Sequence, residues 1–398
     1  MSGYLPPHTK EGPASKLFEP EYTLRSQNHE RGPRTHHRVA VPKDIIPTVD
    51  TMIQIGTKEK PNLVEIPPIG FGLWGWGDVI SYGWGPSGGY DQNLDEKSVA
   101  EAFDTILKHF PTAFFDVAEH YGYTDGFAES IFGVNFQEKM RAHRDRIVLA
   151  SKFLPTPWRH PWMYPDVTLK SLEGSIIRTK LGRIDIYQLH GPSHFGFWPK
   201  LSTLCEALCL AYQTGSVGGI GVCNLSVDQT EYVWKYLKER DVPMVSSQIE
   251  FSLVRMDPLL SGHIRWCHER NITVIAYSPL AVGRLTGKYS SINPPRGNRN
   301  FGHIMWSKID PIIKELKRIG EKMGKTPAAV ALNWVICKGA VPIPTAKNGK
   351  QVEDAVAALG WRLSPEDENA LDDVGVDGRN TWDYNLLKHF QNWWWQQG

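Results

Sequence analysis

The sequence contains few cysteines, no long apolar run and no excess of charge of either sign. Its 398 residues include five cysteines without the spacing of a disulfide framework or a zinc site, which is typical of a reducing compartment. Lys plus Arg total 44 against 43 for Asp plus Glu, so no surplus of positive charge is present to bind phosphates or anionic lipid. The charge balance therefore argues against nucleic-acid and membrane partners.

The distribution of apolar residues also indicates the cellular compartment. No apolar run reaches the roughly 18 residues of a membrane span, and the N-terminus lacks the pattern of a secretory signal. We therefore expect a soluble, cytoplasmic protein. The alternative is a plastid or another organelle, after removal of an import segment.

Three regions of the chain differ in pattern. Residues 1–61 have no apolar period over most of their length, which predicts a largely irregular N-terminal arm. Residues 62–375 alternate short apolar runs with longer helical segments. Residues 376–398 form a Trp-rich tail that ends in NWWWQQG, and because exposed tryptophans often mark an interface, this tail is a candidate site for a protein partner.

Eight apolar runs read as buried strands. They span residues 66–74, 112–117, 146–152, 183–189, 217–223, 244–249, 272–278 and 339–344. Segments with apolar residues near i, i+3, i+4 and i+7 lie between most of them. Eight strands alternating with helices predict an α/β fold, a single-domain (β/α)8 TIM barrel over residues 62–375.

A doubly wound nucleotide-binding sheet is the rival fold. Gly70, Gly72 and Gly75 match the spacing of the dinucleotide fingerprint. That fingerprint requires a helix to begin at once, whereas here a glycine and aromatic loop continues to about Asp95. We therefore interpret the match as accidental.

Four reactive side chains follow neighbouring strands. Asp116 ends the second run, Lys152 the third and His190 follows the fourth, while Tyr121 lies in the loop after Asp116. In a barrel the carboxyl ends of the strands meet at one rim, so these side chains should converge. An inward lysine needs a carboxylate partner, for which Asp116 is the candidate.

This set suits proton transfer. A nearby ammonium stabilises a phenolate and should lower the pKa of Tyr121 from about 10, so that Tyr121 acts as a general acid or base. A neutral His190 beside it can donate a hydrogen bond to a carbonyl oxygen. Each residue alone has an ordinary structural explanation, and only the set of four points to catalysis.

The chain resembles the aldo-keto reductase family over roughly residues 62–375. The resemblance is carried by FFDVAEHYG, LASKF, IYQLHGP, GIGVCNLS, SSQIEFSL, VIAYSPLAVGRLTGKY and VPIPTAKNGKQVEDAVAALGW. It implies an NADP-dependent oxidoreductase that binds NADPH across the barrel mouth and needs no metal. By this resemblance Tyr121 protonates the carbonyl oxygen of an aldehyde or ketone, Lys152 and Asp116 tune Tyr121, and His190 orients the substrate.

The resemblance also implies the cofactor-binding residues. Asn224 and Gln248 should hold the carboxamide, and Tyr277 should stack on the nicotinamide. The whole expected set is Trp74, Asp116, Cys223, Asn224, Gln248, Tyr277, Ser278, Leu280, Lys288, Thr345, Lys347, Gln351 and Asp354. Lys347 is the expected cation for a 2'-phosphate.

Two residues depart from the family pattern. Cys223 stands where the family usually has serine, which weakens one carboxamide hydrogen bond. Ala355 stands where an asparagine commonly contacts adenine. Both departures bear on the preference for NADPH over NADH.

Aromatic loops after the strands suggest the substrate pocket. The expected lining is Trp74, Trp76, Trp84, Trp158, Phe195 and Trp198. Such walls suit a flat or aromatic aldehyde. By resemblance to plant and microbial members, the candidate substrates are small aldehydes or ketones, sugar aldehydes and pyridoxal.

A regulatory role is the alternative. The family's fold also serves as an auxiliary subunit of ion channels, so a cofactor-binding regulatory or scaffold subunit with little turnover is possible. The Trp-rich tail favours that interpretation, and the intact set of Asp116, Tyr121, Lys152 and His190 favours an enzyme.

Overall fold

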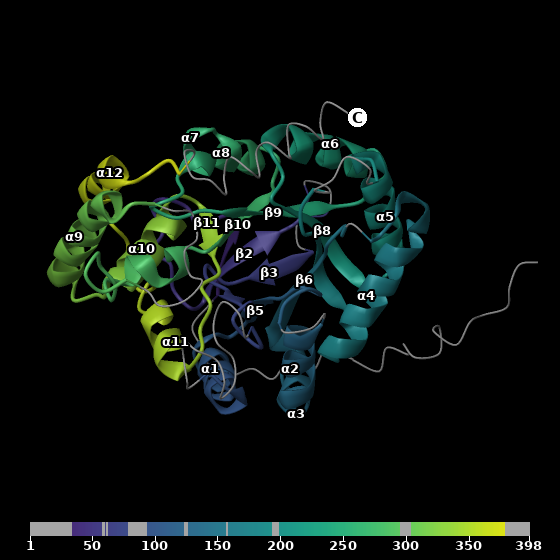
Figure 1. Cartoon of the computed structure of the whole chain (residues 1–398), viewed down its shortest axis with the longest axis horizontal. Coiled ribbons are helices and arrows are strands. Elements are labelled where there is room, and N and C mark those ends of the chain that lie inside the picture. The colour runs from purple at the N-terminus through teal and green to yellow at the C-terminus, as the bar shows by residue number, and fades with distance from the viewer. Residues whose placement is uncertain are drawn as a thin grey trace, which may run out of the picture. The chain divides into compact units, whose positions relative to one another are not determined.

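The computed structural model describes residues 34–57, 60, 63–78, 94–122, 126–156, 158–192, 199–294 and 304–378. Within these ranges eight parallel strands stand side by side in chain order, from β4 to β11, and form a nearly closed barrel (Figure 1). The strands are β4 (Phe71–Gly72), β5 (Ala113–Asp116), β6 (Ile147–Phe153), β7 (Ile184–Leu189), β8 (Val217–Cys223), β9 (Met244–Glu250), β10 (Thr273–Tyr277) and β11 (Ala340–Pro342). Each expected apolar run matches one of them, with β6 and β9 each extending one residue further, so the predicted (β/α)8 fold is confirmed.

The first and last strands meet through backbone hydrogen bonds. The Gly70 N–H donates to the Pro342 carbonyl at 3.0 Å, and the Gly72 N–H donates to the Pro344 carbonyl at 3.1 Å. A Cβ at Gly70 would collide with the Phe114 ring, so glycine allows this close approach. Gly70 and Gly72, two of the three glycines that match the nucleotide fingerprint, therefore lie where the barrel closes.

Helices surround the strands (Figure 1). They are α1 (Glu96–His109), α2 (Phe127–Asn135), α3 (Gln137–Ala142), α4 (Asp166–Thr179), α5 (Leu201–Gln213), α6 (Val227–Lys238), α7 (Asp257–Leu260), α8 (His263–His268), α9 (Trp306–Met323), α10 (Pro327–Cys337), α11 (Gly349–Val356) and α12 (Pro365–Val374). Helix α1 begins where the sequence predicted, because the Asp95 side chain accepts a hydrogen bond from the Ser98 N–H in a capping box. Helices α9, α11 and α12 were not singled out from the sequence.

A small sheet precedes the barrel. It consists of β1 (Thr35–Arg38), β2 (Thr51–Ile55) and β3 (Val64–Ile66), with β2 parallel to β1 and antiparallel to β3. Residues 35–38 and 51–55 lie in the region expected to be largely irregular. They form strands because apolar side chains of β2, among them Met52, Ile53 and Ile55, are buried.

No helix in the described ranges is long and apolar enough to cross a bilayer.

Candidate active site

The four side chains expected to converge do so at the carboxyl ends of neighbouring strands. Asp116 is the last residue of β5, Lys152 lies near the end of β6, and His190 directly follows β7. A cavity of about 970 Å³ opens at this end of the barrel, and Asp116, Tyr121 and His190 line it. Lys152 lies behind them and is fully buried.

Lys152 and Asp116 form a buried ion pair. The Lys152 Nζ lies 2.5 Å from Asp116 Oδ2, and the exposed fractions of the two side chains are 0% and 2%. The ammonium also donates to the Val117 carbonyl at 3.0 Å and to the Tyr121 hydroxyl at 3.2 Å. These three acceptors use all three protons of the ammonium, which is how a buried charge is made tolerable.

The other carboxylate oxygen of Asp116 accepts from two amides. Gln248 Nε2 donates to Asp116 Oδ1 at 2.7 Å, and Gln188 Nε2 donates to the same oxygen at 3.1 Å. The Cys223 thiol donates to Gln248 Oε1 at 3.7 Å. Burial raises the pKa of Cys223 to about 12, so it remains a neutral thiol.

The pKa of Tyr121 differs from the sequence expectation. Burial raises it, Lys152 lowers it and Asp116 raises it, and the outcome is a pKa of about 12. The expected lowering by Lys152 is present, but desolvation of the phenolate outweighs it. Tyr121 is therefore a protonated phenol near neutral pH, which is the form of a proton donor.

Lys152 keeps its charge in this environment. Burial lowers its pKa, but Asp116 and then Tyr121 raise it, and the net pKa lies above that of an ordinary lysine. The group that donates to the Tyr121 hydroxyl is thus an ammonium. Because that hydroxyl already accepts from Lys152, its own proton is left for another acceptor.

His190 lies beside Tyr121. Their ring centroids are 5.6 Å apart in an edge-to-face arrangement. The His190 carbonyl accepts from Asn224 Nδ2 at 3.0 Å, and Asn224 Oδ1 accepts from the Tyr277 hydroxyl at 2.8 Å. This chain of hydrogen bonds connects the ends of β7, β8 and β10.

A second ion pair, between Glu119 and Arg159, holds the loop that carries Tyr121 and was not predicted from the sequence. Glu119 is buried and accepts from Arg159 at 2.6 and 3.1 Å and from the Leu154 N–H at 2.9 Å. These bonds join the loop after β5 to the loop after β6. His120, between Glu119 and Tyr121, also lines the cavity. In the sequence, the only indication of these two site residues was that Glu119 and His120 directly precede Tyr121.

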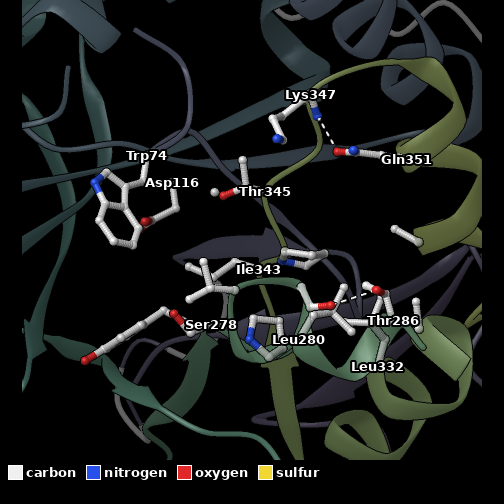
Figure 2. A pocket seen from close by; sticks show the side chains of 18 of the residues that line it. Trp74, Asp116, Ser278, Leu280, Thr286, Leu332, Ile343, Thr345, Lys347 and Gln351 are labelled. Carbon is white, nitrogen blue, oxygen red and sulfur yellow. Dashed lines mark hydrogen bonds between the residues drawn. The ribbon is translucent and has the colours of Figure 1, made fainter. Parts of the chain in front are cut away.

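The same cavity reaches every residue of the expected cofactor set. Besides Asp116 these are Trp74, Cys223, Asn224, Gln248, Tyr277, Ser278, Leu280, Lys288, Thr345, Lys347, Gln351 and Asp354. Figure 2 shows Trp74 and Asp116 on one side of the pocket and Lys347 and Gln351 on another. Residues more than 200 positions apart in the sequence therefore share one surface.

The end of the cavity formed by α11 is rich in cations. Lys347 and Lys350 line the cavity together with Asp354, which pairs with Lys350 at 3.2 Å, and Lys288 lines the same cavity from the segment after β10. The Lys347 N–H donates to Gln351 Oε1 at 3.0 Å, as Figure 2 shows, so that Lys347 is held at the start of the helix. Ammonium groups beside the N-terminus of α11 can bind phosphate groups. The side-chain amides of Asn224 and Gln248, elsewhere on the cavity wall, can hydrogen-bond a carboxamide. The cavity therefore fits a nicotinamide dinucleotide.

The expected substrate residues have different placements. Trp74 lines the cavity, whereas Trp76 is fully buried and donates through Nε1 to the Ala346 carbonyl at 3.0 Å. Trp158 is 66% exposed and is not among the cavity-lining residues. Trp84, Phe195 and Trp198 lie outside the described residues.

Comparisons with known proteins give one family. The family model "Aldo/keto reductase family" matches residues 68–375. A chloroplastic pyridoxal reductase of Arabidopsis thaliana is 34% identical over 337 residues, which cover 83% of this chain and 89% of that protein. An L-glyceraldehyde 3-phosphate reductase of Escherichia coli (strain K12) is 26% identical over 336 residues, covering 80% and 92%.

A solved structure has the same fold. An aldo/keto reductase from Klebsiella pneumoniae, in complex with NADP and acetate, has a TM-score of 0.58 at 24% identity and covers 80% of this chain and 94% of its own.

We expect Asp116→Ala to lower the free energy of unfolding by about 3–5 kcal/mol, because it leaves the Lys152 ammonium buried without a counter-charge. Urea denaturation followed by circular dichroism measures the loss. The double variant Asp116→Ala with Lys152→Met removes both charges and should recover part of the stability. Equal losses in the single and double variants would contradict this account.

Proposed function

This chain belongs to the aldo/keto reductase family, and we propose that it is an NADPH-dependent carbonyl reductase that converts a small aldehyde or ketone to an alcohol. Membership makes it an oxidoreductase. The observation that carries the proposal is that Tyr121 lines the cavity and that its hydroxyl accepts a hydrogen bond from the buried Lys152 ammonium.

In the proposed reaction, Tyr121 is the general acid. NADPH, when bound, supplies the hydride that the carbonyl carbon gains. Because Tyr121 accepts from Lys152, its O–H points its proton elsewhere, and the substrate oxygen is the proposed acceptor. The raised pKa of Tyr121 keeps that proton in place until negative charge develops on the oxygen.

Lys152, Asp116 and His190 support the transfer. The Lys152 ammonium stabilises the phenolate that remains after Tyr121 gives up its proton. Asp116 holds Lys152 in position through the 2.5 Å contact. We propose that the His190 side chain, next to Tyr121, directs the carbonyl oxygen toward the phenol.

We propose pyridoxal and other flat aldehydes as the first substrates to test. The support is the name of the Arabidopsis relative, a pyridoxal reductase, and the aromatic side chains of Trp74 and Tyr277 on the cavity wall. A planar ring gains large apolar contact area from such walls.

We further propose that the cofactor spans the cavity. Its nicotinamide would lie against Tyr277, with the carboxamide near Asn224 and Gln248, and its 2'-phosphate near Lys347. Ser278, Leu280, Lys288, Thr345, Gln351 and Asp354 complete the proposed cofactor contacts, all of them on the cavity wall. The Klebsiella relative crystallised with NADP supports a nicotinamide cofactor in this family.

The regulatory-subunit alternative is not favoured. All four proposed catalytic residues are present and converge, and the relatives reported above are named as reductases. Residues 379–398 of the Trp-rich tail, which contain its tryptophans and supported this alternative, lie outside the described residues.

Tyr121→Phe should lower kcat for aldehyde reduction by at least about 100-fold, because it removes the general acid. NADPH affinity should stay within a few-fold of the wild type. NADPH oxidation followed at 340 nm with pyridoxal, an aromatic aldehyde, methylglyoxal and an aldose measures turnover, and quenching of protein fluorescence measures binding. Retained turnover would remove Tyr121 from this role.

The pH dependence should differ between the two directions. With a pKa of about 12, Tyr121 stays protonated at lower pH, so the proton supply for reduction should not be lost between about pH 7 and 9. Alcohol oxidation needs the phenolate, whose fraction rises about tenfold per pH unit below the pKa, and should therefore accelerate with pH. Initial rates in both directions test this, and oxidation that is independent of pH would contradict it.

Lys347→Ala should weaken NADPH binding more than NADH binding, because it removes a charge proposed to contact only the 2'-phosphate. A preference change of about tenfold is expected for one charge-assisted contact. Dissociation constants for both cofactors measure it, and Lys235→Ala is the matched control, since Lys235 pairs with Glu231 on α6 and is not among the cavity-lining residues. Equal losses for NADPH and NADH in Lys347→Ala would show that the 2'-phosphate binds elsewhere.

A further inference from the structure

Gln188 is a buried polar residue that the proposed mechanism does not use. It lies in β7, two residues before His190, and its exposed fraction is 0%. It is not among the cavity-lining residues, so it is not placed to touch a substrate or a cofactor. A fully buried amide in a barrel core needs partners, and those of Gln188 are the Asp116 carboxylate and the Gln248 amide.

The three side chains meet across the inside of the barrel. Asp116, Gln188 and Gln248 belong to β5, β7 and β9, which are alternate strands. Side chains from alternate strands fill one layer of such a barrel. This layer is polar, whereas layers of this kind are usually built from branched apolar residues.

A glycine on the intervening strand makes room for the contact. Gly221 pairs with Gln188 in the β7–β8 register. A Cβ at Gly221 would lie 2.8 Å from Gln188 Cγ and would also collide with the Ser246 hydroxyl. The missing side chain lets Gln188 extend between β5 and β9.

The hydrogen bonds fix the orientation of both neighbours. Gln188 donates to Asp116 Oδ1 at 3.1 Å, leaving Oδ2 to face Lys152, and its Oε1 accepts from Gln248 Nε2 at 3.5 Å. Because Gln248 Nε2 also donates to Asp116 Oδ1 at 2.7 Å, both of its protons are engaged. Gln248 therefore turns Oε1, and not its N–H groups, toward Cys223, which lines the cavity together with Gln248.

We propose that Gln188 is a positioning residue for catalysis, which locks the Asp116 carboxylate toward Lys152 and the Gln248 amide with its oxygen toward the cofactor. Gln248 is then an acceptor for the N–H of a carboxamide. The inference rests on the proposed function. It adds that Gln188, which touches no reacting atom, orients two groups. Through Asp116 it positions the Lys152 ammonium that contacts Tyr121, and through Gln248 it positions the proposed cofactor contact.

Gln188→Met tests the proposal, because it keeps the length of the side chain and removes both hydrogen-bonding groups. We expect kcat for pyridoxal reduction to fall about tenfold or more, with the KM for pyridoxal within about threefold, since a small displacement of a catalytic group is costly. The NADPH dissociation constant should rise about three- to tenfold, measured by fluorescence on the same protein at a temperature well below its Tm.

Asn333→Leu is the matched control. Asn333 is another fully buried amide, and it donates to the Ala358 and Trp361 carbonyls, outside the catalytic group. It should lower Tm but leave kcat and the NADPH dissociation constant within about twofold. If Gln188→Met also stays within twofold on both measures, Gln188 only packs the core and the proposal is overturned.

Repeating the substitution in an Asp116→Asn variant distinguishes a positioning role of Gln188 from a role in core packing alone. In Asp116→Asn the carboxylate is already gone, so adding Gln188→Met should lower kcat by about threefold or less. The same tenfold factor in both backgrounds would overturn the proposal. If Gln188→Met does not fold, Gln188→Glu keeps the length and shape, and it should lower kcat at least as much because a second carboxyl meets Asp116.

The two proposals fail in different ways. A wild-type protein that binds NADPH but reduces no carbonyl compound would end the proposed reductase function. The NADPH dissociation constants of Gln188→Met and Asn333→Leu would still decide whether Gln188 orients the cofactor contact.

Discussion

The buried ion pair between Asp116 and Lys152 is the constraint on which the rest of the site depends. Two charges are removed from water inside the barrel, and this is tolerable only when every donor and acceptor of both groups is engaged. Lys152 engages Asp116, the Val117 carbonyl and Tyr121, while two amides donate to the remaining oxygen of Asp116. The Lys152 ammonium therefore requires both the Tyr121 hydroxyl and the Val117 carbonyl to lie within hydrogen-bond distance of it.

The same burial decides which chemistry Tyr121 is suited to. Removal of water opposes the phenolate more strongly than Lys152 supports it, so the resting side chain is a protonated phenol with a pKa of about 12. The ammonium stays charged because its pKa is raised in the folded protein. In the proposed reaction, the Lys152 ammonium stabilises Tyr121 most strongly when negative charge develops on the phenol oxygen, which is the condition for stabilising a transition state more than the ground state.

Much of the fold was predictable, because strands buried on both faces read as continuous apolar runs and their polar residues fall at the carboxyl ends. Asp116, Lys152 and His190 were found in this way. Gln188 was not, since a glutamine inside IYQLHG gains its partners only from strands 72 and 60 residues away. Trp74 and Trp76 were indistinguishable in the sequence, yet one lines the cavity and the other is buried. The pKa of Tyr121 was misjudged because the sequence shows a cation but not the depth of burial.

The two ends of the cavity differ in how many hydrogen bonds connect their side chains, and this difference affects which end tolerates substitution. At the catalytic end Asp116, Gln188 and Gln248 hold one another from three different strands, so a substitution of any of them disturbs more than one contact. At the other end Lys347 and Gln351 are joined through one loop and the first turn of α11, and the short side chain of Ala355 lines the cavity there. A loosely coupled end can alter cofactor preference without moving Tyr121. In the proposed function, the barrel strands therefore hold the catalytic residues, while cofactor affinity and specificity depend on the residues around the rim.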